Sequence, residues 1–566
     1  MAGTGTRNIL RLFPRACTVR VKAPFPFSGA LTLVLGVLVV IPNRTQAEPL
    51  SDDSTRCEAL TDADLSGIQD APTQVTNTRL APATRTTPSY CLVEGYVVPQ
   101  IGFELRLPSP GWNGKLLVVG SGGWGGFLYE DDCDRYLRRG YACIGSDTGH
   151  KGTGDDGLWA SHNLQAQVDF GYRSVHVATL AGKSIVERYY TRAPQQSYFV
   201  GCSTGGYEGL VEAQHFPWDF DGIIAGAPDM DEADLAMRLV WNVRSFNSKS
   251  GQPAFSTSDI QVLHHAVLDA CDMDDGVKDG VVGNPVSCRF DPGELRCGAA
   301  RNSASCLTQL QIDAAVRIYT GASNSKGKSV STRGLLPGSE LSWIDKFSGR
   351  NGLSMLESAE SFFRYMLYGV SPDWKARDFD FDRDYTRIGL AVLYNNTNPD
   401  LRKFKAAGGK LIVYQGGSDS VEVPGAILDY YTTAERTMGG RASAQEFFRF
   451  FVIPGMDHCT GGVGAYAIDY LTYLEDWVEQ HKAPDVLLGA HVRDSYLATL
   501  PLSSRWQFLG TTPQARVLAG PWELEFPLKP DIPVAFTRPV YPYPLFAKFR
   551  GYGDPNDGAN FGPVSP

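Results

Sequence analysis

Short apolar runs and longer amphipathic segments alternate along the chain from about residue 115. The runs KLLVVG, YACIGSD, SYFVG and DGIIAGAP are rich in β-branched or aromatic residues and end near glycine, proline or aspartate, which is typical of buried strands. Residues 166–190 repeat apolar side chains at helical spacing, and residues 207–216 form a second helical pattern. This β-α-β order predicts a parallel sheet with helices on both faces.

The alternation is lost over residues 229–401, which are rich in cysteine, aspartate and aromatic residues, and returns with the strand-like KLIVYQGGSD. The simplest architecture is an α/β domain made of residues 48–228 and 402–566, with residues 229–401 inserted as a separate lid domain. An insertion at this point would lie over the carboxyl ends of the strands, where open α/β sheets bind ligands.

Residues 1–47 contain no acidic residue, and five basic residues precede the apolar stretch SGALTLVLGVLVVIP. This pattern is typical of a secretory signal peptide, and we expect cleavage after Ala47. The apolar stretch is shorter than the roughly 20 residues of a membrane-spanning helix. We therefore expect a secreted or periplasmic protein that has no membrane contact once the signal peptide is removed.

The chain is acidic, with a formal charge of −10 that becomes −16 when the six basic residues of the signal segment are removed. Nucleic acids and anionic membranes both require a basic surface. The charge therefore favours a small-molecule partner and argues against nucleic acid.

Ten cysteines remain when Cys17 is removed with the signal segment. An even number of cysteines in an exported protein indicates disulfides. No pair has the C-x-x-C spacing of a zinc site, which argues against zinc.

The stretch VGCSTGG places Gly201, Ser203 and Gly205 in a G-x-S-x-G motif between a predicted strand and a predicted helix. In that context the motif forms a sharp turn that presents the serine hydroxyl at the top of the sheet. Ser203 is therefore the candidate nucleophile, and a serine nucleophile needs a base and an acid that orients the base.

Two later turns supply candidates in the order serine, acid, histidine that α/β-hydrolases use. YQGGSDSVEVP places Asp419 after a buried strand, and IPGMDHCTGG places His458 after the next strand. Glu422 and Asp457 are rivals for the acid. Asp457 adjoins the histidine in sequence, which makes it poorly placed to accept a hydrogen bond from the ring.

Cys202 precedes the candidate nucleophile, and Cys459 follows the candidate base. A disulfide between them would hold Ser203 and His458 together across the whole insertion. Positional errors of this kind can cost about 100-fold in rate.

On the motifs GCSTGG, GMDHC and GGSD, the chain resembles the tannase and feruloyl esterase family of α/β-hydrolases, which includes an enzyme that hydrolyses mono(2-hydroxyethyl) terephthalate. The resemblance extends from about Cys57 to the helix containing LEDWVE. It implies an α/β-hydrolase fold with a large inserted lid, serine esterase activity, and a disulfide between Cys202 and Cys459.

The same resemblance implies further disulfides within the insertion. These are Cys271–Cys288 and Cys297–Cys306. A pair Cys57–Cys91 then follows near the N-terminus, which leaves Cys133 to pair with Cys143.

An oxyanion hole needs two backbone N–H donors. One is expected from Thr204, the residue after the nucleophile, and the other from the glycine-rich turn GSGGWGG, at Gly122 or Gly123.

The stretch CDMDDGVKDGVV places four aspartates within eight residues around a glycine turn, which suggests a hard cation, most plausibly Ca²⁺. The family has a structural calcium loop of the form C-D-x-x-D-G-x-x-D-G, and the resemblance implies five ligands. These are the side chains of Asp272, Asp275 and Asp279 and the carbonyls of Val277 and Val281. We expect no organic cofactor.

The stretch SAESFFRYMLYG resembles a lid segment of feruloyl esterases, and aromatic side chains suit a planar acyl group. Phe363 and Arg364 are the candidate acyl-binding residues, with Trp124 as a further wall. Ordinary core packing of an amphipathic helix is the alternative for the first two.

We therefore expect a secreted serine esterase acting on esters of aromatic acids, with feruloyl or other hydroxycinnamoyl esters first, galloyl esters second and terephthalate monoesters third. A terephthalate monoester would require an arginine that faces the acyl pocket. The alternative of another class is a non-catalytic, calcium-stabilised binding module.

Overall fold

The computed structural model describes residues 52–85, 87–128, 132–298, 305–369, 373–386, 389–497 and 531–566. The predicted signal peptide, residues 1–47, lies outside these ranges. Within the described ranges, no helix is both long enough and apolar enough to cross a membrane.

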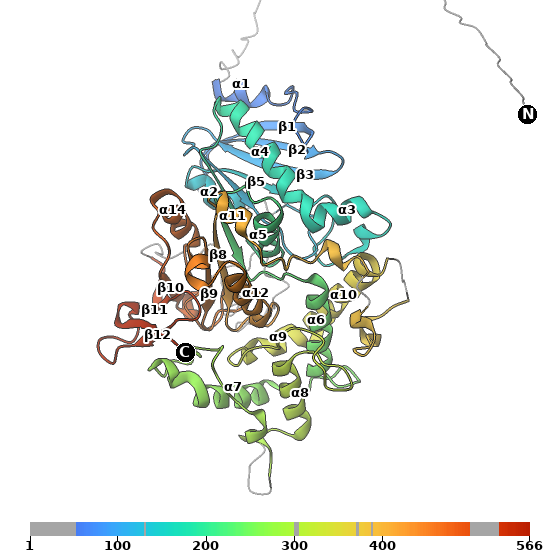
Figure 1. The fold of residues 1–566 in the computed structure, drawn as a ribbon, viewed down its shortest axis with the longest axis vertical. Coiled ribbons are helices and arrows are strands. Elements are labelled where there is room, and N and C mark those ends of the chain that lie inside the picture. The colour runs from blue at the N-terminus through green and yellow to red at the C-terminus, as the bar shows by residue number, and fades with distance from the viewer. Residues whose placement is uncertain are drawn as a thin grey trace, which may run out of the picture. The chain divides into compact units, whose positions relative to one another are not determined.

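Nine strands of the described chain form one mixed sheet in the order β1-β2-β3-β5-β4-β6-β7-β8-β9 (Figure 1). Strands β4 to β9 are parallel to one another, as the sequence pattern predicts, while β1, β2 and β3 extend the sheet in antiparallel fashion. The strands are β1 (Thr73–Ala81), β2 (Tyr90–Val97), β3 (Ile101–Pro108), β4 (Lys115–Val119), β5 (Ala142–Ser146), β6 (Gln196–Cys202), β7 (Gly222–Gly226), β8 (Lys410–Gly416) and β9 (Phe448–Ile453).

Side chains that alternate along the strands form two cores, one on each face of the sheet. In β4, Leu116 and Val118 belong to one core, and Leu117 and Val119 belong to the other. Helices α4, α5 and α12 cover the first face, and α2 and α14 cover the second. Their bounds are α2 (Asp132–Arg138), α4 (Ser174–Tyr190), α5 (Thr204–His215), α12 (Pro424–Thr437) and α14 (Tyr470–Gln480).

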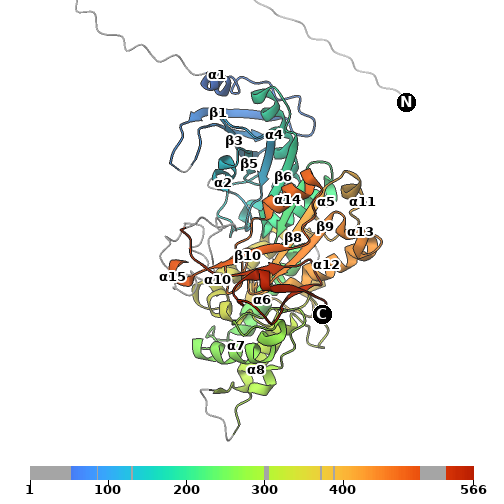
Figure 2. The same ribbon diagram turned by 90° about the vertical axis from the view of Figure 1, so that its left-hand side faces the viewer.

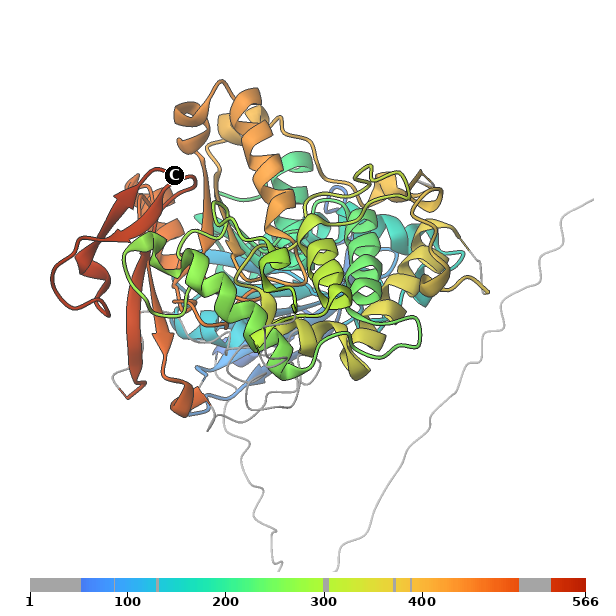
Figure 3. The same cartoon turned by 90° about the horizontal axis from the view of Figure 1, so that it is seen from below.

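A long insertion separates β7 from β8 and contains most of the remaining helices. Figures 1 and 2 show those of them that lie before residue 362 gathered together, away from β1 to β3, and Figure 3 shows this group in front of the strands. They are α6 (Glu232–Phe246), α7 (Thr257–Cys271), α8 (Gln309–Thr320), α9 (Trp343–Phe347) and α10 (Gly349–Ser361), with α11 (Arg402–Ala406) leading into β8. The predicted lid segment, residues 229–401, lies within this insertion.

Side-chain caps fix where several insertion helices begin. Asp231 accepts hydrogen bonds from Ala233 N and Asp234 N, which places the start of α6 directly after β7. Ser256 and Asp259 form a reciprocal capping box at the start of α7.

The C-terminal part of the chain adds two small antiparallel sheets, β10 with β11 and β12 with β13. The remaining elements are α1 (Asp52–Glu58), α3 (Leu164–Val168), α13 (Arg441–Gln445), β10 (Leu487–Val492), α15 (Asp494–Leu497), β11 (Val534–Val540), β12 (Phe546–Phe549) and β13 (Phe561–Val564).

Candidate active site

Ser203 occupies a sharp turn between β6 and α5. Its φ of 62° and ψ of −124° lie in a region that non-glycine residues rarely adopt. Ser203 N donates to Gly226 O on the neighbouring strand at 3.0 Å. A Cβ on Gly201 would lie 2.5 Å from Gly205 O, and a Cβ on Gly206 would lie 2.1 Å from Gly226 O. The turn therefore requires glycine at both flanking positions.

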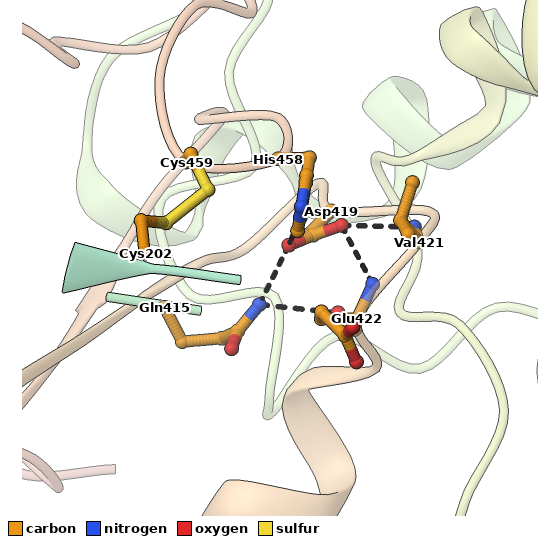
Figure 4. Close-up of a disulfide and its surroundings, with 7 residues drawn as sticks. All are labelled: Cys202, Gln415, Asp419, Val421, Glu422, His458 and Cys459. Carbon is orange, nitrogen blue, oxygen red and sulfur yellow. Dashed lines mark hydrogen bonds and ion pairs between the residues drawn. A yellow bond between two sulfur atoms is a disulfide. The ribbon is translucent and has the colours of Figure 1, made fainter. Parts of the chain in front are cut away.

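His458 and Asp419 face each other from the loops that follow β9 and β8 (Figure 4). His458 Nδ1 lies 2.9 Å from Asp419 Oδ2. The buried Asp419 carboxylate also accepts hydrogen bonds from Val421 N at 2.8 Å, Glu422 N at 2.9 Å and Gln415 Nε2 at 2.9 Å. These three donors fix the orientation of the carboxylate toward the imidazole.

The two rival acids have other surroundings. Glu422 Oε2 lies 3.8 Å from the guanidinium of Arg238, within a buried cluster of charged side chains. Asp457 Oδ1 is buried and has no hydrogen-bond partner among the described residues. Asp419 is therefore the acid that this structure brings to His458.

A disulfide joins Cys202 to Cys459, with their Cα atoms 6.0 Å apart although 257 positions separate them in sequence. It lies beside His458 in Figure 4. Ser203 and His458 are therefore each adjacent in sequence to one cysteine of this disulfide. All five expected pairs are present, the others being Cys57–Cys91, Cys133–Cys143, Cys271–Cys288 and Cys297–Cys306.

One cavity of about 260 Å³ brings together the candidate catalytic residues and the insertion. Ser203, Thr204 and His458 line it on the side of the sheet. The insertion contributes apolar and polar side chains from α6 and α10, which are Leu235, Leu239, Asn351, Ser354, Met355 and Ser358. A ligand bound in this cavity would therefore contact both the sheet side and the insertion.

Gly122 and Gly123 line the same cavity, beside Thr204. Thr204 Oγ1 donates to Gly123 O at 2.6 Å, which ties the glycine-rich turn to the start of α5. Gly123 has a φ of +55°, and a Cβ there would lie 2.4 Å from Gly154 O. Trp124 N already donates to Gly154 O at 2.6 Å, so this N–H group is engaged within the protein.

Trp124 lines the cavity, but Phe363 and Arg364 do not, which departs from the sequence expectation. Phe363 is buried in a cluster of aromatic rings, with the nearest ring centroids 5.1 Å away. Arg364 Nη1 lies 3.3 Å from Glu360 Oε1, and its guanidinium covers the ring of Tyr365. The segment packs as an ordinary amphipathic helix does, with its aromatic side chains in the core.

Sequence reasoning missed several charged residues that line the cavity. Asp155 and Glu232 are among them, and burial raises the pKa of the Glu232 carboxyl group well above its usual value. Arg135 on α2 also lines the cavity. No local motif marks these residues, because they come from three separate segments.

The aspartates of the predicted calcium loop follow directly after α7. Asp272 and Asp275 are buried, and burial raises the pKa of Asp275 to about 7. Asp279 pairs with Arg538 on β11, and Asp272 accepts hydrogen bonds from backbone N–H groups of its own loop.

A small cavity of about 20 Å³ is lined by Asp275, Asp279 and Val281, roughly the space of one water molecule. The donors of the predicted site are carboxylates and carbonyl oxygens, which are the ligands that Ca²⁺ prefers. The residues present therefore fit a calcium ion chemically.

A second group of possible metal ligands is buried between α4 and α5. Nδ1 of His176 and carboxylate oxygens of Glu212 and Asp219 lie within 4.8 Å of one another. His176 already shares a hydrogen bond with Asp219, and Lys183 Nζ donates to the backbone of Asp219. A lysine thus supplies the positive charge here, and none of these residues lines the catalytic cavity.

Comparison with known proteins identifies related chains along most of the length. The family model "Tannase and feruloyl esterase" matches residues 84–564. Mono(2-hydroxyethyl) terephthalate hydrolase of Piscinibacter sakaiensis is 31% identical, with 93% of each chain covered. A probable feruloyl esterase B of Emericella nidulans is 32% identical over 68% of this chain and 74% of the relative.

The crystal structure of feruloyl esterase B from Aspergillus oryzae has the same fold, with a TM-score of 0.75 and 25% identity over 90% of this chain and 100% of that one. The relatives named above are ester hydrolases. This chain therefore belongs to the tannase and feruloyl esterase family and is a carboxylic ester hydrolase.

Proposed function

We propose that the protein is an exported serine esterase that hydrolyses esters of aromatic acids through an acyl-enzyme. The observation that carries this proposal is the placement of Ser203 and His458 on one cavity, with Asp419 hydrogen-bonded to the histidine. The non-catalytic binding module is set aside, because the related proteins are esterases and all three residues are present.

In the proposed reaction, Ser203 Oγ attacks the ester carbonyl while His458 Nε2 accepts the hydroxyl proton. Asp419 holds the opposite ring nitrogen, which keeps Nε2 free to act as the base. His458 then donates the proton to the leaving alcohol. Water, activated by the same imidazole, hydrolyses the acyl-enzyme and releases the acid.

The negative charge that forms on the carbonyl oxygen requires two N–H donors. We assign these to the backbone of Thr204 and of Gly122 or Gly123. The hydrogen bond from Thr204 Oγ1 to Gly123 O supports the assignment, because it holds the two donor segments against each other.

Aromatic acyl groups are favoured because the aromatic residues Trp124 and Tyr136 line a cavity whose other walls include Leu235 and Leu239. Feruloyl and other hydroxycinnamoyl esters are the first choice, and galloyl esters the second. Terephthalate monoesters are the third choice, and two observations support them. One is Arg135 on the cavity wall, and the other is the similarity to mono(2-hydroxyethyl) terephthalate hydrolase.

Export is supported by the five disulfides, since disulfides persist in oxidising compartments. We propose in addition that Asp272, Asp275 and Asp279, with the carbonyls of Val277 and Val281, hold a structural Ca²⁺ ion. The ion would hold together the loop that follows α7 and would take no part in the chemistry, because its ligands do not line the cavity that contains Ser203.

The experiment that tests this function is hydrolysis of methyl ferulate, methyl gallate, mono(2-hydroxyethyl) terephthalate and p-nitrophenyl butyrate by the purified protein and by Ser203→Ala. We expect faster turnover of an aromatic ester than of the butyrate, and loss of that turnover in the variant. Preference for the butyrate would contradict the aromatic assignment.

A further inference from the structure

Glu208 is a buried acidic residue on α5, five positions after Ser203, and it is only 3% exposed. No ion pair with a lysine or arginine is found for it among the described residues. Burial raises the pKa of Glu208 to about 7, although hydrogen bonds from Ser121 act in the opposite direction. Burial of a carboxyl group without a cation is costly, so a contribution to stability does not explain the position of Glu208.

Both carboxylate oxygens of Glu208 contact the glycine-rich turn. Ser121 N donates to Oε2 at 2.7 Å, and Ser121 Oγ donates to Oε1 at 2.7 Å. Ser121 lies directly before Gly122, one of the two candidate oxyanion donors. This two-point contact fixes the backbone and the side chain of Ser121, whose carbonyl forms the next peptide bond, the one that carries the Gly122 N–H group.

The helix and the turn also approach each other closely at this point. A Cβ on Gly120 would lie 2.7 Å from Gly205 Cα and 2.9 Å from Glu208 Oε2. On the other side of Gly122, Thr204 Oγ1 donates to Gly123 O. The turn is therefore tied to α5 on both sides of Gly122, by one side chain from each of the first two turns of the helix.

We propose that Glu208 is a positioning residue, which holds the glycine-rich turn so that its backbone N–H group faces the oxyanion formed at Ser203. This inference rests on the proposed serine mechanism. Glu208 does not touch the substrate. It acts through Ser121, and it couples the oxyanion donor to the same helix that begins at the nucleophile.

The test compares Glu208→Leu with Glu208→Gln. Glutamine can accept from Ser121 N and donate to Ser121 Oγ, so it preserves the tie, whereas leucine removes it at similar volume. We expect Glu208→Leu to lower kcat about 100-fold with KM changed less than about 3-fold, because an oxyanion donor acts mainly in the transition state. We expect Glu208→Gln to stay within about 5-fold of the wild-type kcat.

Glu212→Leu is the matched control, since Glu212 is equally buried one turn further along α5 but makes no hydrogen bond to the glycine-rich turn. It should leave kcat of the folded enzyme unchanged. The rate of inactivation by a fluorophosphonate should fall with kcat in Glu208→Leu, because the phosphonyl oxygen occupies the oxyanion site.

Wild-type kcat in Glu208→Leu would overturn the inference, and so would equal losses in the leucine and glutamine variants. Should Glu208→Leu fail to fold, Ser121→Ala removes one of the two contacts, and we expect it to lower kcat about 10-fold with little change in KM. An unchanged kcat in Ser121→Ala would also overturn the inference. Ser203→Ala separates this result from the proposed function, since full activity in that variant would reject the serine mechanism itself.

Discussion

Cys202 and Cys459 form a disulfide that links the residue before Ser203 to the residue after His458. The two cysteines lie on opposite sides of the long insertion in sequence. The covalent bond therefore fixes the distance between the two loops, which packing of the sheet would otherwise maintain alone. Because it adjoins the proposed nucleophile and base, we expect it to act on geometry as well as on stability.

Replacing both cysteines by alanine should therefore reduce turnover more than substrate affinity. We expect kcat to fall about 100-fold with a small change in KM, because a small displacement of a nucleophile from its base has an effect of this size. Steady-state kinetics of Cys202→Ala with Cys459→Ala measure this. The double alanine variant of Cys57–Cys91 is the control, and it should lower the melting temperature without changing kcat. Equal kcat in both double variants would show that the first disulfide is only structural.

The contact between Asp419 and His458 predicts which acid matters. Asp419→Asn should lower kcat by up to about 10⁴-fold, because the amide no longer holds the imidazole tautomer that leaves Nε2 free. Asp457→Asn and Glu422→Gln should retain much more activity, since neither carboxylate is bonded to the ring. A larger loss in Asp457→Asn than in Asp419→Asn would contradict the assignment.

Calcium should stabilise the folded chain without being needed for the chemistry. Removal of metal by a chelator should lower the melting temperature, and added Ca²⁺ should restore it, because a ligand that binds only the folded state stabilises it. The restoration should disappear in Asp275→Asn and persist in Asp274→Asn, whose side chain is exposed in the same loop. A metal-free protein whose melting temperature does not respond to Ca²⁺ would refute the calcium site.

His150 should make the protein less stable at acidic pH. Burial lowers the pKa of His150 to about 4, below its unfolded value of about 6.5. Between these values the unfolded chain binds a proton that folded His150 does not, so the free energy of unfolding falls as the pH falls through this window, by about 3 kcal/mol in total. Above pH 7 this contribution is constant.

The measurement is denaturant unfolding of the wild type and of His150→Gln from pH 7.5 to pH 4. Glutamine can still donate to Trp124 O, which His150 Nε2 contacts at 2.9 Å. The free energy of the wild type should fall more steeply than that of the variant below pH 6.5. Parallel curves would mean that His150 titrates normally in the folded state.

Local sequence patterns were enough to predict the parallel half of the sheet and the catalytic candidates. Ser203, Asp419 and His458 each follow a strand with a clear apolar pattern, and the fold places such positions at one edge of the sheet. Strand β1 was not predicted, because buried and exposed positions follow one another irregularly along it and its pairing shifts between Val75 and Asn77.

The supporting contacts depend on chain segments that meet only in three dimensions. Glu208 and Ser121 are 87 positions apart, and neither belongs to a motif that predicts their contact. Phe363 was expected to bind the acyl group and is instead buried among other aromatic rings. An aromatic run on an amphipathic helix has the same sequence pattern whether it packs in the core or faces a ligand. Only the packing of the insertion distinguishes these two cases.

The most direct test of the central claim is mass spectrometry of the protein after reaction with a fluorophosphonate. The account predicts one phosphonyl group on the peptide that contains Ser203, with no labelling of Ser203→Ala and slow labelling of His458→Ala. An unlabelled Ser203 in a protein that still hydrolyses aromatic esters would contradict the account, because the nucleophile would then lie elsewhere.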